Sequence, residues 1–312
     1  GAVGAAGLIA NTSGSTDKIV LKHIGLENVN IDVSTDGVIG ALLADNARGH
    51  VIVSNCFVTG SIKGTGSSVY AGGLVGKSTG YNPGGLLNIS DCYSTATITV
   101  TGTTYDGILE YAPITVMGKA FAGGILGRAH DAETITNCHN FGVITTTSTG
   151  VSMAGGITAI LADGAISNCS NTANISATSS FATNDSDNVF PFKYISAAGM
   201  LAFSVTDNRM TTITGCYNAG NIAATLTTNK TDKTDVFAGG IGGRTHRQNV
   251  SDCYNTGTVS AGNADGSLGY AGGIVGRNSA GGYVQRSYST GAISGANPGG
   301  IVGLAMEGSN TR

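Results

Sequence analysis

The sequence has little of what helical proteins and many enzymes carry. Trp is absent, Pro occurs 4 times, and charged residues make up 11% of the 312 residues, against about a quarter in an average soluble domain. Runs of Ala, Leu, Glu and Lys at helical spacing are missing, which argues against a helical fold. No stretch has the length and apolarity of a membrane span. The composition therefore favours an all-β protein.

The charge distribution excludes another class of protein. The net charge is −3, and no basic or acidic block interrupts the chain. Because nucleic-acid-binding proteins typically carry a clustered positive surface, nucleic acid is not an expected partner. The low charge does not indicate disorder, since 41% of the residues are hydrophobic and can form a core. Abundant Gly, Thr, Ser, Asn, Val and Ile are typical of short strands and turns.

One phrase recurs along the chain: a small residue, two Gly, an aliphatic residue, any residue, and Gly. Ala71–Gly76 and Ala122–Gly127 are complete copies. The Gly before the aliphatic residue marks coil starts near positions 7, 40, 73, 124, 156, 199, 240, 273 and 300. The markers are 27 to 51 residues apart. Repeat units of this length, with short apolar strands separated by Gly or Asn, are typical of a solenoid whose coils cover one another. We therefore predict a single parallel β-solenoid of about nine coils over residues 1–312.

A second phrase follows each marker: an aliphatic residue, Ser or Thr, Asn or Asp, Cys, and an aromatic residue. It gives an equivalent place to Cys56, Cys92, Cys138, Cys169, Cys216 and Cys253. An even number of Cys suits a disulfide framework, but equivalent side chains in successive coils run parallel, which disfavours pairing. We expect a structural core column of free, inward thiols, with Leu26 at the Cys place of the first coil. The spacing does not support a zinc site.

Together these two phrases resemble the GLUG-motif repeat family. Gly273–Gly276 and Asp252–Gly257 carry the resemblance most clearly, and it extends over nearly the whole chain. Members of the family are bacterial surface or secreted proteins, including adhesin-like filaments and repeat regions of large secreted proteases. The resemblance implies a right-handed parallel β-helix and an extracellular or cell-surface location in a bacterium.

The repeat units differ in length at one place, between the Val/Ile strand and the next Gly-Gly. The longest insertions are Thr99–Ala120, Ala177–Ser196 and Ala224–Val236. Because the insertions share one place in the repeat, we predict loops along one edge of the solenoid. Asp185 with Asp187, and Asp232 with Asp235, are candidate weak calcium ligands within these loops.

An aromatic residue follows most of the Cys residues. The resulting column is Phe57, Tyr93, His139, Tyr217, Tyr254 and Tyr288, interrupted by Ser170. If each Cys points inward, alternation along the strand turns this column to solvent. The column would then be either a packing ladder that stiffens the rod or a ligand-contact face that stacks on sugars.

Two polar columns accompany the aromatic column. The first, two residues after each Cys, is Ser94, Asn140, Asn171, Asn218, Asn255 and Ser289, and we expect it to satisfy backbone groups at a bend. The second, just after the Gly-x-x-Gly strand, is Lys77, Arg128, Arg244 and Arg277. We expect these cations to be solvated and to oppose aggregation. A basic stripe for anionic glycans is the alternative.

The sequence predicts no enzyme and no catalytic, cofactor-binding or metal site. Glycan-cleaving β-helix proteins need convergent carboxylates, whereas the 19 acidic residues here are scattered. Asp91 and Asp252 share a place in the repeat but lie several coils apart.

The leading hypothesis is an extracellular structural or adhesive segment that presents loops and a flat face to a host protein, matrix protein or carbohydrate. One alternative is a noncatalytic spacer or substrate-presenting region of a large secreted protease or glycan-degrading enzyme. Ice binding is a minor alternative, because the paired Thr pattern is seen only at Thr97-x-Thr99. Both chain ends lie within a repeat, so we expect further coils or end-to-end self-association.

Overall fold

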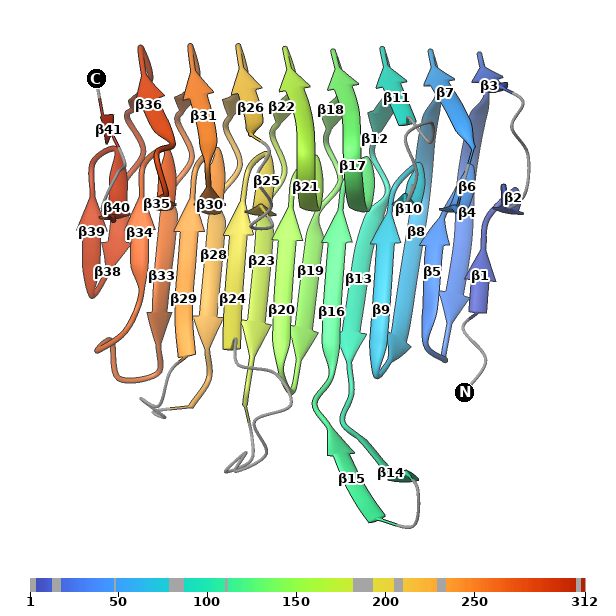
Figure 1. Cartoon of the computed structure of the whole chain (residues 1–312), viewed down its shortest axis with the longest axis horizontal. Helices are drawn as coiled ribbons and strands as arrows, with labels where there is room; N and C mark the ends of the chain where they lie inside the picture. Colours follow the sequence, from blue (N-terminus) through green and yellow to red (C-terminus); the bar gives the residue numbers. More distant parts are fainter. Residues whose placement is uncertain are drawn as a thin grey trace.

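The protein is a parallel β-solenoid. The computed structural model describes residues 4–12, 18–47, 49–78, 87–109, 112–181, 193–204, 210–228, 234–306 and 310–311. Within these ranges all regular structure is β, arranged in three long sheets of nine, 16 and 14 strands and one sheet of two strands. The coils follow one another along a rod with the two chain ends at opposite ends (Figure 1). The all-β solenoid fold predicted from the repeats is confirmed.

Sheet A takes one strand from each coil, and its strands follow chain order. They are β1 (Gly4–Ala6), β5 (Gly37–Gly40), β9 (Ser68–Gly72), β16 (Lys119–Gly123), β20 (Val151–Gly155), β24 (Lys193–Ala198), β29 (Thr234–Gly239), β34 (Tyr270–Gly272) and β39 (Asn297–Gly299). All are paired in parallel, so equivalent residues of successive coils stack directly on one another.

Sheet B follows sheet A after the Gly-Gly bend and has two runs of strands. The first run is β2 (Ile9–Asn11), β6 (Leu43–Asn46), β10 (Val75–Ser78), β17 (Leu126–Thr136), β21 (Thr158–Ser167), β25 (Leu201–Ser204), β30 (Gly242–His246), β35 (Val275–Ser279) and β40 (Val302–Ala305). The second run is β3 (Lys18–Lys22), β7 (His50–Ser54), β11 (Leu87–Ser90), β26 (Thr211–Thr214), β31 (Gln248–Ser251), β36 (Tyr283–Gln285) and β41 (Asn310–Thr311). β17 and β21 extend through both runs.

Sheet C contains the Cys-aromatic strands and the Val/Ile strands. The former are β12 (Tyr93–Ser94), β18 (His139–Asn140), β22 (Ser170–Asn171), β27 (Tyr217–Asn218), β32 (Tyr254–Asn255) and β37 (Tyr288–Ser289). The latter are β13 (Thr97–Gly102), β19 (Ile144–Ser148), β23 (Ile175–Ser179), β28 (Ile222–Leu226), β33 (Val259–Asn263) and β38 (Ile293–Gly295). β4 (Gly25–Val33) and β8 (Phe57–Gly66) span both groups.

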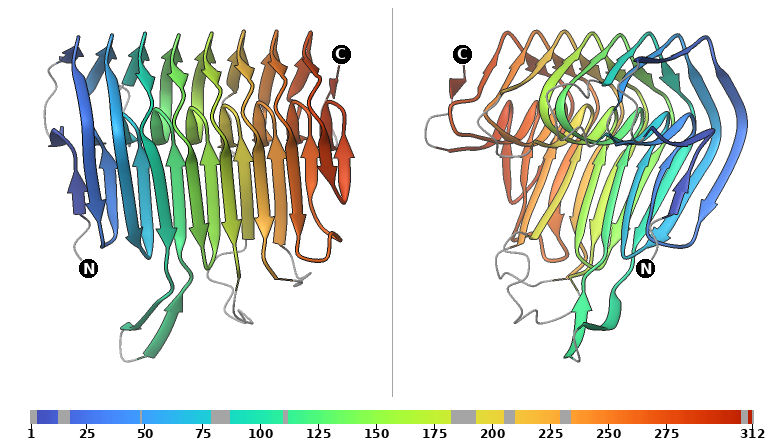
Figure 2. Two further views of the ribbon diagram at one scale, coloured as in Figure 1. Left: turned by 180° about the vertical axis from the view of Figure 1, so that it is seen from behind. Right: turned by 45° about the vertical axis from the view of Figure 1, so that its right-hand side comes forward.

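The three predicted insertions all connect a sheet C strand to a sheet A strand, and so lie on one edge. The first contains β14 (Tyr105–Leu109) and β15 (Ala112–Val116), an antiparallel hairpin that projects from the rod in both views (Figures 1 and 2). Residues 182–192 and 229–233 of the other two lie outside the described residues. Asp185, Asp187 and Asp232 are therefore not placed.

Two bends explain the recurring sequence phrases. At the bend from sheet A to sheet B, a Cβ on Gly72 would collide with the Val75 carbonyl oxygen, so the phrase requires Gly. The residue before each Cys has a left-handed backbone, with φ of 53° at Asn55, 54° at Asp91 and 56° at Asp252. Asn, Asp and Gly tolerate this conformation best, which accounts for the (Asn/Asp)-Cys pairing.

The first two coils differ in register from the prediction. Gly40 pairs with Gly72, and Gly72 pairs with Gly123, so marker 40 lies one place earlier than markers 73 and 124. In the first coil, Gly25 pairs with Phe57, and the Phe57 amide donates to the Ile24 carbonyl at 3.0 Å. Ile24, not Leu26, therefore takes the Cys place.

Candidate functional site

The outer face of sheet C carries the aromatic column, and most of its rings cover one another. Phe57 stacks on Tyr93 with centroids 5.1 Å apart and planes 3° apart. Tyr217 stacks on Tyr254 at 5.1 Å, and Tyr254 on Tyr288 at 5.4 Å, with planes within 8°. Because parallel stacked rings hide their faces and present their edges, these pairs act mainly as a packing ladder.

The aromatic column is interrupted at Ser170, but the missing ring leaves no open gap there. Ser170 is 1% exposed, and its hydroxyl lies 2.8 Å from Nδ1 of His139. A ring-sized ligand therefore finds no free space between His139 and Tyr217.

One aromatic ring on this face breaks the pattern. Phe141, which follows β18, is 49% exposed, and its ring meets Tyr93 at 6.4 Å and 68°. It lies 6.3 Å from the His139 ring at 36°. Neither contact is a parallel stack, so neither ring lies flat on the Phe141 face. Val143, nearby in the chain, is 43% exposed.

We call Phe57, Tyr93, His139, Phe141 and Val143 the aromatic patch. Its exposed members include Tyr93, at 38%. Phe141 was not among the residues predicted to contact a ligand, because its place is not aromatic in other coils. The equivalent residues, three after each Cys or its Ser replacement, are Thr59, Thr95, Thr172, Ala219, Thr256 and Thr290. The departure from small residues was the available signal in the sequence.

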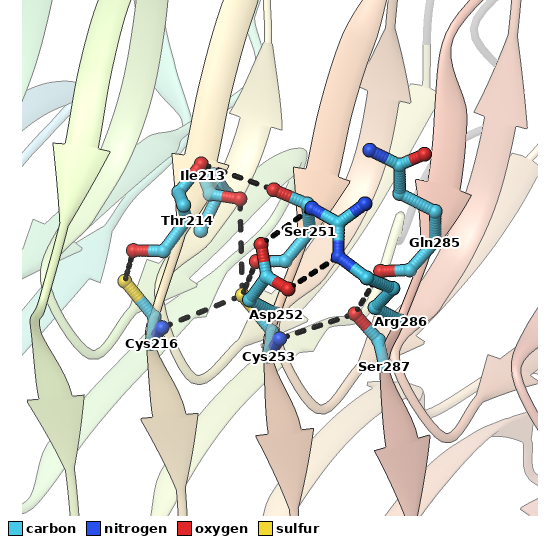
Figure 3. Close-up of polar contacts among 9 residues, drawn as sticks. All are labelled: Ile213, Thr214, Cys216, Ser251, Asp252, Cys253, Gln285, Arg286 and Ser287. Atoms are coloured by element: carbon cyan, nitrogen blue, oxygen red, sulfur yellow. Dashed lines mark hydrogen bonds and ion pairs between the residues drawn. The ribbon is translucent and has the colours of Figure 1, made fainter.

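The six Cys lie in the core and form no disulfide. The amide of one Cys faces the sulfur of the next, as in Cys169 to Cys216 at 3.4 Å. At the end of the column the Cys253 amide donates to the Ser287 hydroxyl at 3.1 Å (Figure 3). Contacts with the neighbouring thiols, and then burial, raise the pKa of Cys138. The column is a packing element without access to a ligand.

The amide column satisfies the backbone at the next bend. Nδ2 of Asn171 donates to the Ala173 carbonyl at 2.8 Å and to Oδ1 of Asn218 at 2.7 Å. The same pair of bonds recurs at Asn140, Asn218 and Asn255, with Ser289 accepting the last one. These residues are structural.

The column of cations departs from its predicted role. Lys77 pairs in register with Arg128, and Arg244 with Arg277, on the outer face of sheet B. Arg244 is only 6% exposed, so the expectation of a solvated charge is wrong for it. The reason is that the outer faces of sheets A and B meet at the Gly-Gly bend, where Arg244 packs against aromatic rings of both sheets.

The register of sheet C agrees with the predicted places of Thr97 and Thr99, which pair with Ser61 and Lys63. One outward column is Thr65, Thr101, Thr147, Thr178 and Thr225. Because Thr99 pairs with Thr145 and Thr101 with Thr147, the structure adds two paired positions to Thr97-x-Thr99, namely Thr99-x-Thr101 and Thr145-x-Thr147.

The acidic residues of the repeat are engaged in structural contacts. Asp91 accepts a bond from Nδ2 of Asn137 at 2.8 Å. Asp252 accepts Nε and Nη2 of Arg286 at 2.6 and 2.7 Å (Figure 3), and these bonds lower its pKa. Within the described ranges, no three His, Cys, Asp or Glu side chains are grouped as a metal site would need. The same ranges contain no helix suited to crossing a membrane.

Comparisons with known proteins agree with the repeat pattern. The family model of the GLUG motif matches residues 67–99, which contain the bend at Gly72 and the strand pair around Cys92. A search of curated proteins found no match. A crystal structure of a candidate immunoglobulin A1 protease from Bacteroides ovatus is 16% identical, with a TM-score of 0.47 over 76% of this chain. This chain covers 57% of that one. The resemblance to the GLUG motif is thus confirmed over one repeat of the solenoid.

Proposed function

We propose that this chain is a noncatalytic, extracellular adhesive segment that binds a carbohydrate through the aromatic patch on sheet C. The observation that carries the proposal is the half-exposed Phe141 ring, turned 68° from the neighbouring Tyr93 ring. The GLUG match supports an extracellular location, since the family that the chain resembles comprises surface and secreted proteins.

The chemistry of the patch suits a sugar ring. Aromatic rings bind the apolar C–H face of a sugar by face-on contact, and neighbouring polar tips hydrogen-bond its hydroxyl groups. Phe141 supplies the ring, while the Tyr93 hydroxyl and the His139 imidazole supply polar groups at its sides. Val143 extends the apolar surface.

The rigid scaffold favours binding over catalysis. Phe57, Tyr93 and His139 all stand on strands of one continuous sheet, so their spacing is held by the parallel ladder. The repeated carboxylate two residues before Tyr93, that of Asp91, accepts a hydrogen bond from Asn137. A patch of this kind orders a ligand and leaves its covalent bonds intact.

A glycan array, followed by calorimetry with the best ligand, tests the proposal. We expect Phe141→Thr, which restores the residue found at Thr95 and Thr172, to weaken binding by at least about tenfold, since an aromatic contact contributes roughly 0.5–1.5 kcal/mol in addition to the apolar area that it buries. Met210→Thr is the control, because Met210 is 53% exposed and directly precedes β26 of sheet B, away from the aromatic patch on sheet C. The absence of any glycan ligand, or equal binding by the Phe141 variant, would favour a spacer instead.

The threonine column supports ice binding as a second candidate. Thr65, Thr101, Thr147, Thr178 and Thr225 repeat at the strand spacing of about 4.8 Å. Thr99, Thr145 and Ser176 form a neighbouring hydroxyl column. Lys63 and Ala223 limit the paired region to a few coils. Thermal hysteresis by the protein, lost in Thr147→Lys, would establish this activity, and its absence would exclude it.

A further inference from the structure

A second cluster of side chains lies outside the solenoid core, where the outer faces of sheets A and B meet. Its buried members are Phe121, Met153, Ala159, Ile160, Tyr194, Ala202 and Phe237. Arginines from sheet B lie over the aromatic rings of this cluster. We call this the outer corner, and it is independent of the aromatic patch on sheet C.

Arg244 is held between two rings of the outer corner. Its guanidinium carbon lies 4.5 Å from the Tyr194 ring centre and 4.7 Å from that of Phe203. The side chain is 6% exposed. Cation–π contact satisfies the faces of a guanidinium but not the N–H groups at its edge. Nε and Nη1 of Arg244 are buried and have no hydrogen-bond partner.

A second arginine stands one coil away on the same face. Arg277 pairs in register with Arg244, lies 5.7 Å from the Phe237 ring, and also has a buried Nε without a partner. Burial lowers the pKa of Arg244, and the charge of Arg277 acts in the same direction. A buried cation beside a partly buried one, each with a buried donor that lacks a partner, is unfavourable unless an acceptor neutralises the pair.

Asp235 does not supply that acceptor. Its Oδ2 lies 3.9 Å from Nη1 of Arg277, beyond hydrogen-bond distance. Burial raises the pKa of Asp235 despite the nearby positive charges of Arg277 and Arg244. One carboxylate against two guanidiniums leaves a net positive charge at this part of the corner.

We propose that Arg244 and Arg277 form a binding site for an oxyanion, a carboxylate or sulfate group carried by a ligand. Guanidinium donors at adjacent coils match oxygens of one such group, because charge-assisted bonds to oxyanions are what Arg forms most strongly. Tyr194 and Phe203 fix the Arg244 side chain in place. The site is therefore ordered before the ligand arrives, which reduces the entropy cost of binding.

Arg286 is a matched control within the same protein. Its Nε and Nη2 already bind both carboxylate oxygens of Asp252, as Figure 3 shows. It is exposed, so it reports non-specific attraction of anions. An oxyanion that binds unpaired donors should shift the NMR signals of Arg244 and Arg277 and leave the signal of Arg286 unchanged.

NMR of the arginine Nε–Hε groups in the whole chain tests the proposal, with signals assigned from single Arg→Lys variants. Sodium sulfate, sodium acetate and sodium chloride are titrated at matched ionic strength. We expect saturable shifts of the Arg244 and Arg277 signals with sulfate or acetate, and none with chloride. The stronger of the two oxyanions identifies whether sulfated or carboxylated ligands are preferred.

Arg277→Gln separates binding from stability, because its side chain is 15% exposed and its loss disturbs the corner less than loss of Arg244. We expect this variant to weaken the oxyanion-dependent shift of Arg244 at least about tenfold, and Arg286→Gln to leave it unchanged. Shifts that do not saturate, or that are equal at Arg286, would overturn the proposal. Because the site lies on sheets A and B, this result is independent of carbohydrate binding at Phe141.

Discussion

The Phe141 ring meets the Tyr93 ring at 68°, with centroids 6.4 Å apart, whereas Tyr93 lies within 3° of parallel to Phe57. The change of direction occurs where other coils carry small residues such as Thr95 and Thr172. A regular ladder hides its ring faces, and a residue that leaves the ladder can expose one. The proposed binding face therefore lies where the repeat is broken.

The amide column predicts a large stability effect at Asn171. Asn171→Ala removes the bonds to the Ala173 carbonyl and to Asn218, and leaves Nδ2 of Asn140 without its acceptor. We expect the free energy of unfolding to fall by about 2–4 kcal/mol, measured by urea denaturation. Asn174→Ala, at an exposed position, should change it by less than about 0.5 kcal/mol. Equal effects of the two variants would show that the column does not stabilise the coils.

The left-handed bend before each Cys predicts opposite outcomes for two substitutions at Asn168, where φ is 53°. Asn168→Gly should be nearly neutral, because Gly215 occupies the equivalent place with φ 65°. Asn168→Val should cost about 1–2 kcal/mol or more, since a β-branched residue is strained in this conformation. Thermal denaturation of both variants measures the difference. A Val variant as stable as the Gly variant would contradict the account of the bend.

The Asp252–Arg286 pair predicts a pH dependence. Hydrogen bonds from Arg286 lower the pKa of Asp252 in the folded protein below the value of about 3.9 expected when unfolded. The stabilisation is therefore complete above about pH 4 and is lost as the pH falls through the folded pKa. Asp252→Asn should lower the melting temperature at pH 7, and the gap to the wild type should close near pH 2. A gap that is constant over this range would show that the ion pair contributes nothing.

Because the six thiols are buried, we predict that they react slowly with thiol reagents in the folded protein. All six Cys are free and buried, and a thiol reagent reacts with exposed thiolates. We expect native protein to show almost no reaction with such a reagent, and all six thiols to react after denaturation. Rapid reaction of any thiol in the native state would indicate that its coil opens locally.

The repeat allowed the coil architecture to be predicted because steric rules fix its key residues. Gly72 has no room for a Cβ beside Val75, and Asp91 and Asp252 adopt a left-handed backbone. Such places tolerate few residue types, so they recur visibly in the sequence. The first coil was harder to align, because it has no Cys and a bulge between Leu26 and Val29 shifts its register against the next coil.

The environment of Arg244 was not predictable from strand alternation. Alternation places Arg244 on the outer face of sheet B, and an outward cation is normally solvated. The angle at which sheets A and B meet brings Tyr194 against it, and that angle is a property of the stacked coils rather than of one strand. Phe141 was not predicted for a different reason. The repeat pattern consists of residues that the coils share, and Phe141 differs from the residues at its place in the other coils.

The most direct measurement of the central claim is NMR of the protein with ¹³C-labelled Phe rings during titration with its best carbohydrate ligand. We predict that the Phe141 ring signals shift saturably, that Phe121, in the outer corner, does not respond, and that Phe141→Thr weakens binding at least about tenfold. Carbohydrate binding that leaves the Phe141 signals unmoved would contradict the account.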